Sequence, residues 1–301
     1  MINPVSSLFI QQVLVKGFLD LFSSSLAWER ISLRRSQTLI DSKRGNFYRR
    51  EVEILYQDKY LIAVNKPAGL VVQGAKRQEE SLLIALKSYL KERENKAGEV
   101  FLAVVHRLDK PVSGVCLLAR RSKCAAKLFK IMQEGLWEKV YVGKVEGILK
   151  EKFGLWEDYL CYEADAKRVQ RFNRQVSAAK RALTFFQVLE TEGKTTLLLL
   201  SPLTGRKHQL RAVLSGRGYP IIGDFRYGSK VRILGGKAIL LHALYLALPH
   251  PYEEKRLELW ADFPSYFRAK TLDKNLIIEF LYRIRLFKER GNYVPSQNLG
   301  D

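Results

Sequence analysis

Cysteine and histidine are scarce in this sequence, and those present are poorly arranged to bind a metal. The 301 residues include three cysteines, Cys116, Cys124 and Cys161, and four histidines. No two cysteines form a C-x-x-C pair, and the histidines are widely separated, which argues against a zinc site. The odd number of cysteines argues against a disulfide framework. Both features fit a reducing compartment, so we expect a cytoplasmic protein.

A long uninterrupted apolar run is also missing. The first 28 residues are apolar, but Gln11, Gln12, Lys16 and Asp20 interrupt them, and no basic region precedes them. This falls short of the roughly 20 consecutive apolar residues of a membrane span. We expect an amphipathic helix that docks on the body of the protein, with a targeting presequence as the open alternative. The chain has neither a dinucleotide fingerprint nor a P-loop.

Acidic residues are few. The chain has 31 Asp and Glu against 51 Lys and Arg, a formal net charge of +20 at pH 7, and a pI near 9.8. Such an excess attracts polyanions, and phosphate contacts make nucleic acid a more probable partner than an anionic membrane surface. Hydrophobic residues make up 47% of the chain, enough for a large core. We expect an apolar and basic extension over residues 1–50, a catalytic domain over 51–270 and a helical tail over 271–301.

The hydrophobic pattern predicts strands that mostly follow one another through short turns. Strands are expected over residues 52–72 on both sides of a turn, and over 101–108, 114–120, 139–149, 239–250 and 255–263, with a hairpin centred on 192–194. Amphipathic helices are expected over 81–96, 122–138 with Ser122 as N-cap, from near His208, and over 271–292. Residues 157–180 read as a polar, basic excursion. Together they predict an α+β fold with a mixed, mostly antiparallel sheet and flanking helices.

The stretch VVHRLDKPVSG, residues 104–114, places a lone carboxylate at the end of a predicted strand. Asp109 lies between Arg107 and Lys110, and nearby positive charges favour the ionised form that a carboxylate nucleophile needs. A turn residue is the commoner explanation for an aspartate in this position.

Three further clusters combine polar side chains with turn residues: Lys139-Val140-Tyr141; Thr204 to Arg211, which reads TGRKHQLR; and GDFRYG at 223–228 together with LLHA at 240–243. A glycine turn that leads into a basic helix start suits phosphate or carboxylate binding. We therefore expect substrate contacts from Arg206, Lys207, His208 and Gln209. The simpler alternatives are a half-buried sheet tyrosine and a solvated basic helix.

In this order and spacing, the clusters resemble the RluA type of pseudouridine synthase. HRLD followed by SG, then K-x-Y, TGRKHQLR, GDxxYG and LHA, and the upstream YLIAVNKPAGLVV, carry the resemblance across residues 52–265. It implies the pseudouridine synthase catalytic fold and an isomerase that converts uridine in ribosomal or transfer RNA to pseudouridine without metal or cofactor. The target base has to be unpaired or flipped out of a helix.

The resemblance also implies roles for individual residues. Asp109 matches the aspartate that forms a covalent intermediate, on the base or on the sugar. Tyr141 matches the tyrosine that stacks on the flipped base and accepts the C5 proton, and Arg211 matches the arginine that pairs with the aspartate. His106 and Arg107 match loop residues that support base extrusion. Phosphate contacts are expected from the basic excursion, through Arg168, Arg171, Arg174, Lys180 and Arg181.

Two departures from the family pattern stand out. The usual run after HRLD has threonine where this chain has Val112, next to Pro111. No S4-type RNA-binding module is evident in residues 1–50. Because the Asp, Tyr and Arg triple is complete, we expect an active, monomeric enzyme. The alternatives are a catalytically silent RNA-binding or ribosome-assembly factor on the same fold, and a basic protein anchored to a membrane by its apolar N-terminal stretch.

Overall fold

The computed structural model describes residues 52–74, 81–95, 97–268 and 272–289. The extension predicted over residues 1–50, with its amphipathic helix, lies outside these residues. So do the last residues of the predicted C-terminal tail.

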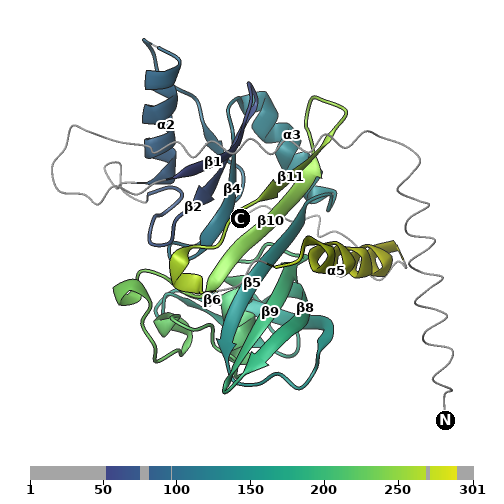
Figure 1. The fold of residues 1–301 in the computed structure, drawn as a ribbon. Coiled ribbons are helices and arrows are strands. Elements are labelled where there is room, and N and C mark those ends of the chain that lie inside the picture. The colour runs from purple at the N-terminus through teal and green to yellow at the C-terminus, as the bar shows by residue number, and fades with distance from the viewer. Residues whose placement is uncertain (1–51, 75–80, 96, 269–271, 290–301) are drawn as a thin grey trace. The chain divides into compact units, whose positions relative to one another are not determined.

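The described residues form a sheet with helices packed against it (Figure 1). Its strands are β1 (Glu53–Gln57), β2 (Leu61–Lys66), β3 (Ala103–Val104), β4 (Ser113–Ala119), β5 (Glu138–Glu146), β6 (Phe153–Glu163), β7 (Arg168–Phe172), β8 (Lys180–Glu192), β9 (Thr195–Pro202), β10 (Leu241–Pro249) and β11 (Arg256–Trp260). The α-helices are α2 (Leu82–Arg93), α3 (Ser122–Gln133), α4 (Gln209–Gly216) and α5 (Lys274–Phe287), and the short 3-10 helices are η1 (Phe225–Tyr227), η2 (Leu234–Gly236) and η3 (Ser265–Phe267).

The sheet is mixed, and most of its pairs are antiparallel. Its strand order is β1-β2-β4-β10-β5-β9-β8-β6-β7, with β11 paired to β10 and β3 paired to β4. Strands β4 and β10 are parallel, whereas β10 is antiparallel to β5, and β5 to β9. The predicted α+β class is confirmed, as is the hairpin turn at residues 192–194 between β8 and β9.

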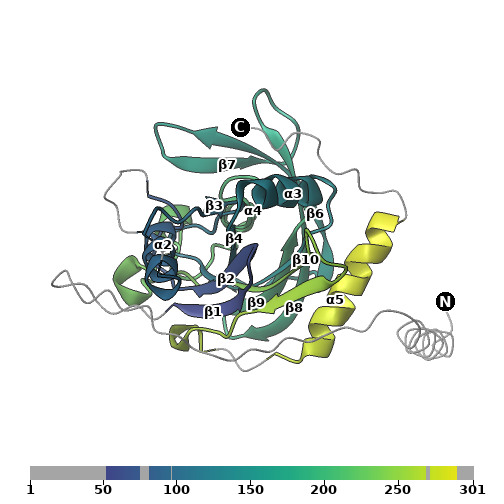
Figure 2. The ribbon, with the colours of Figure 1, turned by 90° about the horizontal axis from the view of Figure 1, so that it is seen from above.

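Different helices cover different parts of the sheet (Figures 1 and 2). The apolar side chains of α2 and α4 belong to one core cluster with residues of β1, β2 and β9. Helix α3 packs in a second cluster over β2, β4 and β10, and α5 packs in a third over β5, β8 and β9. Three of the buried residues of α5, Ile277, Phe280 and Ile284, follow the helical spacing that the sequence displays.

One local prediction was wrong. Ser122 is the first residue of α3 and not its N-cap, a position that Arg121 takes without a side-chain hydrogen bond. The polar, basic excursion predicted over residues 157–180 is largely a β-hairpin, because β6 continues to Glu163 and turns into β7. Buried Trp156, Asp158 and Leu160 alternate along β6, but an aspartate at a buried strand position hides the apolar alternation.

Within the described ranges, no helix combines the length and the hydropathy needed to cross a membrane.

Candidate active site

The loop between β3 and β4 carries Asp109. Leu108 and Val112 on either side of it are buried, at 6% and 3% exposure, so they anchor the loop in the core. The backbone N–H of Val112 donates to the carbonyl oxygen of Asp109 at 3.0 Å, which closes a tight turn. The Asp109 side chain is 27% exposed. Val112, the departure from the family pattern, therefore fills an apolar position of this loop.

A buried lysine fastens the same loop to the neighbouring turn. Lys66, the last residue of β2, is fully buried. Its Nζ donates to the carbonyl oxygens of Pro67 at 2.9 Å, Leu70 at 2.8 Å and Lys110 at 3.4 Å. The Gly69 N–H also donates to the Lys110 carbonyl, at 2.7 Å. The N-K-P-A-G stretch thus holds the backbone directly after Asp109.

The SG and LHA motifs meet where β4 and β10 run parallel. Ser113 is paired with His242 and Gly114 with Ala243 in the strand register. A side chain at Gly114, which has φ +116°, would place its Cβ 2.2 Å from the Ala243 carbonyl oxygen, so only glycine permits this close approach. The Ser113 hydroxyl lies 2.9 Å from His242 Nδ1, and burial lowers the pKa of His242 to about 4. These contacts fix the end of the Asp109 loop.

One guanidinium joins two carboxylates at the centre of the site. Arg211, on the first turn of α4, donates from Nη1 to Asp109 at 2.9 Å. Its Nε and Nη2 donate to the two oxygens of buried Asp224 at 2.7 and 2.8 Å. The Arg211 side chain is only 6% exposed, and the paired carboxylates raise its pKa against the effect of burial. Arg211 is therefore permanently charged. Asp224 binds its Nε and Nη2, and the remaining nitrogen, Nη1, binds Asp109.

The role of Asp224 was not predicted, although its motif was noted. A planar guanidinium has five N–H donors, so one carboxylate partner leaves a buried arginine unsatisfied. Further acceptors are therefore needed near Arg211, and a second carboxylate can supply them. The sequence supplies one in GDFRYG, but only the fold shows that this loop returns to α4.

His208 and Tyr227 complete the cluster. His208 adopts a left-handed conformation, φ 52°, at the N-cap of α4, and its Nε2 lies 3.7 Å from Asp109. The Tyr227 hydroxyl accepts the N–H of Val169 at 2.8 Å and lies 2.9 Å from His208 Nδ1. Burial lowers the pKa of His208 while Asp109 opposes that shift. The imidazole thus lies between the Tyr227 hydroxyl and the Asp109 carboxylate.

Tyr141 on β5 faces the same cluster. It packs, partly buried, against the core cluster that contains Leu108 and Leu210. Burial raises the pKa of its phenol, and the negative charge of Asp109 adds to that shift. Asp109, Tyr141 and Arg211 therefore come together from a loop, a strand and a helix that are far apart in the sequence.

Several predicted substrate-binding residues are engaged within the protein. His106 Nε2 accepts the Leu117 N–H at 2.9 Å, its ring packs edge-on against Trp137, and burial lowers its pKa to about 3. The amide of buried Gln209 accepts from Thr204 and donates to the Leu183 carbonyl at 2.7 and 2.9 Å. These contacts give His106 and Gln209 a part in holding the loops.

The other predicted substrate-binding residues remain closer to solvent. Arg107 is exposed. Arg206 Nε donates to the Arg181 carbonyl at 3.0 Å, and the Lys207 Nζ lies 3.4 Å from the centre of the Tyr162 ring. Their charges thus remain near the surface of the site.

Carboxylates on β6 pair with some of the cations expected to bind phosphate. Arg171 Nε lies 2.6 Å from fully buried Asp158, and Arg181 lies 2.8 Å from Glu157. Asp158 also binds Arg217, at the end of α4, whose Nη2 lies 2.8 Å away. Arg171 therefore positions β7 against the end of α4 as well as contributing charge.

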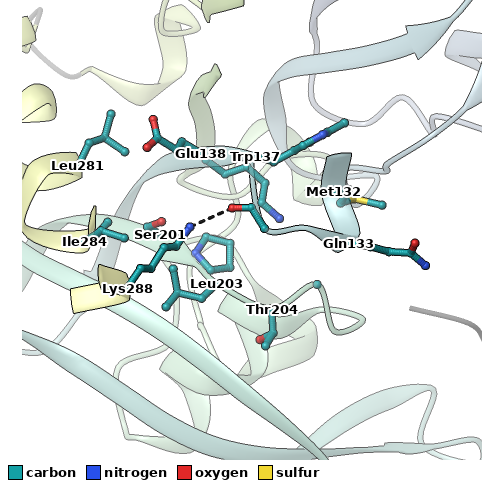
Figure 3. A pocket seen from close by; sticks show the side chains of 14 residues that line it. Met132, Gln133, Trp137, Glu138, Ser201, Leu203, Thr204, Leu281, Ile284 and Lys288 are labelled. Carbon is teal, nitrogen blue, oxygen red and sulfur yellow. Dashed lines mark hydrogen bonds between the residues drawn. The ribbon is translucent and has the colours of Figure 1, made fainter. Parts of the chain in front are cut away.

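The small cavity in Figure 3 is distinct from this cluster. It has a volume of about 50 Å³ and lies between the end of α3, the start of β5, the end of β9 and α5. Lys288 crosses it to the Gly135 carbonyl at 3.1 Å, and the buried Trp137 Nε1 has no hydrogen-bond partner among the described residues (Figure 3). A cavity needs about 10 to 15 Å³ to hold one water molecule, so this one has room for water.

One group of potential metal ligands lies at the other end of β10. Asp58, His250 and Glu253 have ligand atoms within 4.8 Å of one another. However, Asp58 Oδ1 accepts the N–H groups of Tyr60 and Leu61, and Oδ2 lies 2.9 Å from His250 Nε2. These hydrogen bonds give the Asp58 carboxylate a structural role as the cap of a turn.

Comparison with known proteins connects this geometry to one family. The family described as RNA pseudouridylate synthase matches residues 60–216. The tRNA pseudouridine synthase C of Haemophilus ducreyi is 36% identical over 228 residues, which cover 70% of this chain and 90% of that protein. The dual-specificity RNA pseudouridine synthase RluA of Vibrio cholerae is 32% identical over 202 residues, covering 66% of this chain and 78% of that protein.

A solved structure gives the same result for the fold. Human RNA pseudouridylate synthase domain containing 4 superposes with a TM-score of 0.59 at 27% identity, over 77% of this chain and 92% of that one.

Proposed function

The chain belongs to the RNA pseudouridylate synthase family, and from this we propose that it isomerises uridines of transfer or ribosomal RNA with Asp109 as the nucleophile. Relatives named for both substrates support this range: one is a tRNA pseudouridine synthase, one a dual-specificity enzyme, and one a ribosomal large subunit pseudouridine synthase of Buchnera aphidicola that is 31% identical. The net charge of +20 suits either RNA.

The observation that carries the assignment is the Asp224–Arg211–Asp109 array. The buried guanidinium spans both carboxylates at 2.7 to 2.9 Å. Asp224 is 1% exposed and cannot meet substrate, whereas Asp109 is the more exposed member. The array therefore offers one oriented carboxylate to a nucleotide, as covalent catalysis requires.

Isomerisation breaks the bond between N1 of uracil and C1′ of the ribose and forms a bond from C5 to C1′. The C5 proton leaves and N1 gains a proton, so the reaction has no net oxidation or reduction. We infer that Asp109 forms the covalent intermediate, while Arg211 orients its carboxylate through the contact at 2.9 Å.

For Tyr141, the raised pKa of its buried phenol supports the proposed stacking role more directly than the proton-accepting role. A protonated phenol can accept the C5 proton only by releasing its own. The aromatic face, in contrast, is available for a base in either protonation state.

Mapping of pseudouridines at nucleotide resolution tests the function. Total RNA from cells with and without this protein should differ at one or more uridines of transfer or ribosomal RNA, and purified protein should restore them. Identical maps, together with no pseudouridine formation by the purified protein on RNA from the depleted cells, would contradict the proposal.

A further inference from the structure

The segment between α4 and β10 exposes an unusual number of large apolar side chains. Phe225 is 64% exposed, Leu234 56% and Val231 47%. In Figure 1 this segment is green and protrudes at the lower left of the sheet. The same segment carries the cations Arg226, Lys230, Arg232 and Lys237. Exposed apolar side chains surrounded by charge mark an interaction surface.

Phe225 and Arg232 form a pair within this surface. The Arg232 Cζ lies 5.2 Å from the centre of the Phe225 ring, within the range of a cation–π contact. The ring nevertheless keeps most of its area open to solvent. An aromatic ring beside a guanidinium provides a stacking face together with a phosphate-binding charge.

The backbone beneath Phe225 is well fixed. The Tyr227 and Ser229 N–H groups both donate to the Asp224 carbonyl, at 3.0 and 3.1 Å. The Ser229 hydroxyl accepts the Gly223 N–H at 3.0 Å. Phe225 is thus presented from a rigid turn, which lowers the entropy cost of binding through it.

The segment that carries Phe225 also contributes residues to the catalytic cluster. Phe225 directly follows Asp224, which binds Arg211. Two residues later, the Tyr227 ring lies against the same guanidinium, with the Arg211 Cζ 4.8 Å from the ring centre. Arg226 also reaches the Lys167 carbonyl in the turn between β6 and β7. An RNA strand whose uridine enters at Asp109 would therefore pass this surface with a neighbouring nucleotide.

We propose that Phe225, paired with Arg232, is a stacking platform for an unpaired base of the substrate RNA that flanks the flipped uridine. This inference rests on the proposed function, because the RNA is placed by the Asp109 site. Charge complementarity favours RNA, since Arg232 lies against the exposed ring and three further cations belong to the same segment. The platform would hold the strand open after the uridine leaves its stack and would contribute to the choice of target site.

Phe225→Ala tests the platform directly. Stacking of a base on an aromatic side chain predicts about a tenfold rise in both the Kd for RNA and the KM for pseudouridine formation, with kcat little changed. Phe225→Trp should retain wild-type affinity, whereas Phe225→Leu, which stays apolar, should behave like Phe225→Ala. Arg232→Ala should weaken binding more than Lys230→Ala, which removes the same charge from the same segment. The matched control is Phe129→Ala, an aromatic residue on α3 that is 42% exposed.

A photo-cross-link gives a readout that a purely structural role would not change. Total RNA from cells lacking the protein, labelled with 4-thiouridine, should cross-link wild-type protein at the peptide containing Phe225, as mapped by mass spectrometry. Equal KM values for Phe225→Ala and Phe129→Ala with no cross-link at this peptide would overturn the platform. If wild-type protein still formed pseudouridine in that case, the proposed function would stand and only the platform would be lost.

Discussion

Replacement of Asp224 by asparagine should separate positioning of Arg211 from stability of the fold. The side chain of Asp224 is 2% exposed and receives two of the three carboxylate contacts of Arg211, at 2.7 and 2.8 Å. An amide keeps the shape but removes the charge, and its NH₂ group would face a guanidinium N–H. Removal of one partner from a buried ion pair costs about 3 kcal/mol of stability. A misplaced Arg211 would further lower kcat by about 100-fold.

The chain contains a matched control for this change. Asp158 is also fully buried, and it also pairs with two guanidinium groups, those of Arg171 and Arg217. Asp158→Asn should lose a similar free energy of unfolding but retain kcat, because Asp158 does not hold Arg211. Urea unfolding gives the stability of each variant, and single-turnover pseudouridine formation gives the rate. Equal losses of rate in both variants, or an unchanged rate in Asp224→Asn, would refute the positioning argument.

Three further predictions concern the fold and the RNA surface. Burial lowers the pKa of His242 to about 4 and of His106 to about 3 from an ordinary 6.5, so the unfolded chain binds protons first as the pH falls. The free energy of unfolding should therefore decrease between pH 6.5 and 4, by up to about 1.4 kcal/mol per pH unit for each histidine. Urea unfolding at several pH values should show a smaller change of this free energy with pH for His242→Gln than for wild type. An equal pH dependence would be inconsistent with the buried neutral histidine. Gly114→Ala should cost at least about 3 kcal/mol, because its Cβ would lie 2.2 Å from the Ala243 carbonyl oxygen, and a melting temperature equal to that of wild type would disprove the tight β4–β10 contact. The logarithm of RNA affinity should fall linearly with the logarithm of salt concentration, with a slope of about −3.5 if five phosphates are contacted on a single strand. A slope near zero between 50 and 200 mM salt would rule out phosphate-dominated binding.

The sequence identified the residues of the site better than the contacts between them. The Asp109–Arg211 contact, expected from the family resemblance, is present at 2.9 Å. The place of Tyr141 also agrees, since its side chain packs against the core cluster that contains Leu108 and Leu210. Asp109 was expected to rely on its chain neighbours Arg107 and Lys110 as well, but both of these side chains are exposed.

Residues that act through tertiary contacts could not be assigned from local pattern. Lys66 looked like part of a turn, yet it binds the carbonyl of Lys110, 44 residues away. His242 read as part of a strand motif, and its bond to Ser113 joins positions 129 residues apart. His106 and Gln209 resembled substrate ligands because they are polar and lie in site motifs. Their hydrogen bonds to Leu117 and Leu183 depend on packing that a local motif does not encode.

The most direct test of this account is the rate of pseudouridine formation by Asp109→Asn. The change removes the charge of the proposed nucleophile but little volume, and an amide oxygen can still accept from Arg211. Pseudouridine formation should fall by about 10⁴-fold or more in a single-turnover assay, while RNA affinity measured in parallel stays close to that of wild type. A variant that forms pseudouridine at the wild-type rate would contradict the assignment of Asp109 as the nucleophile.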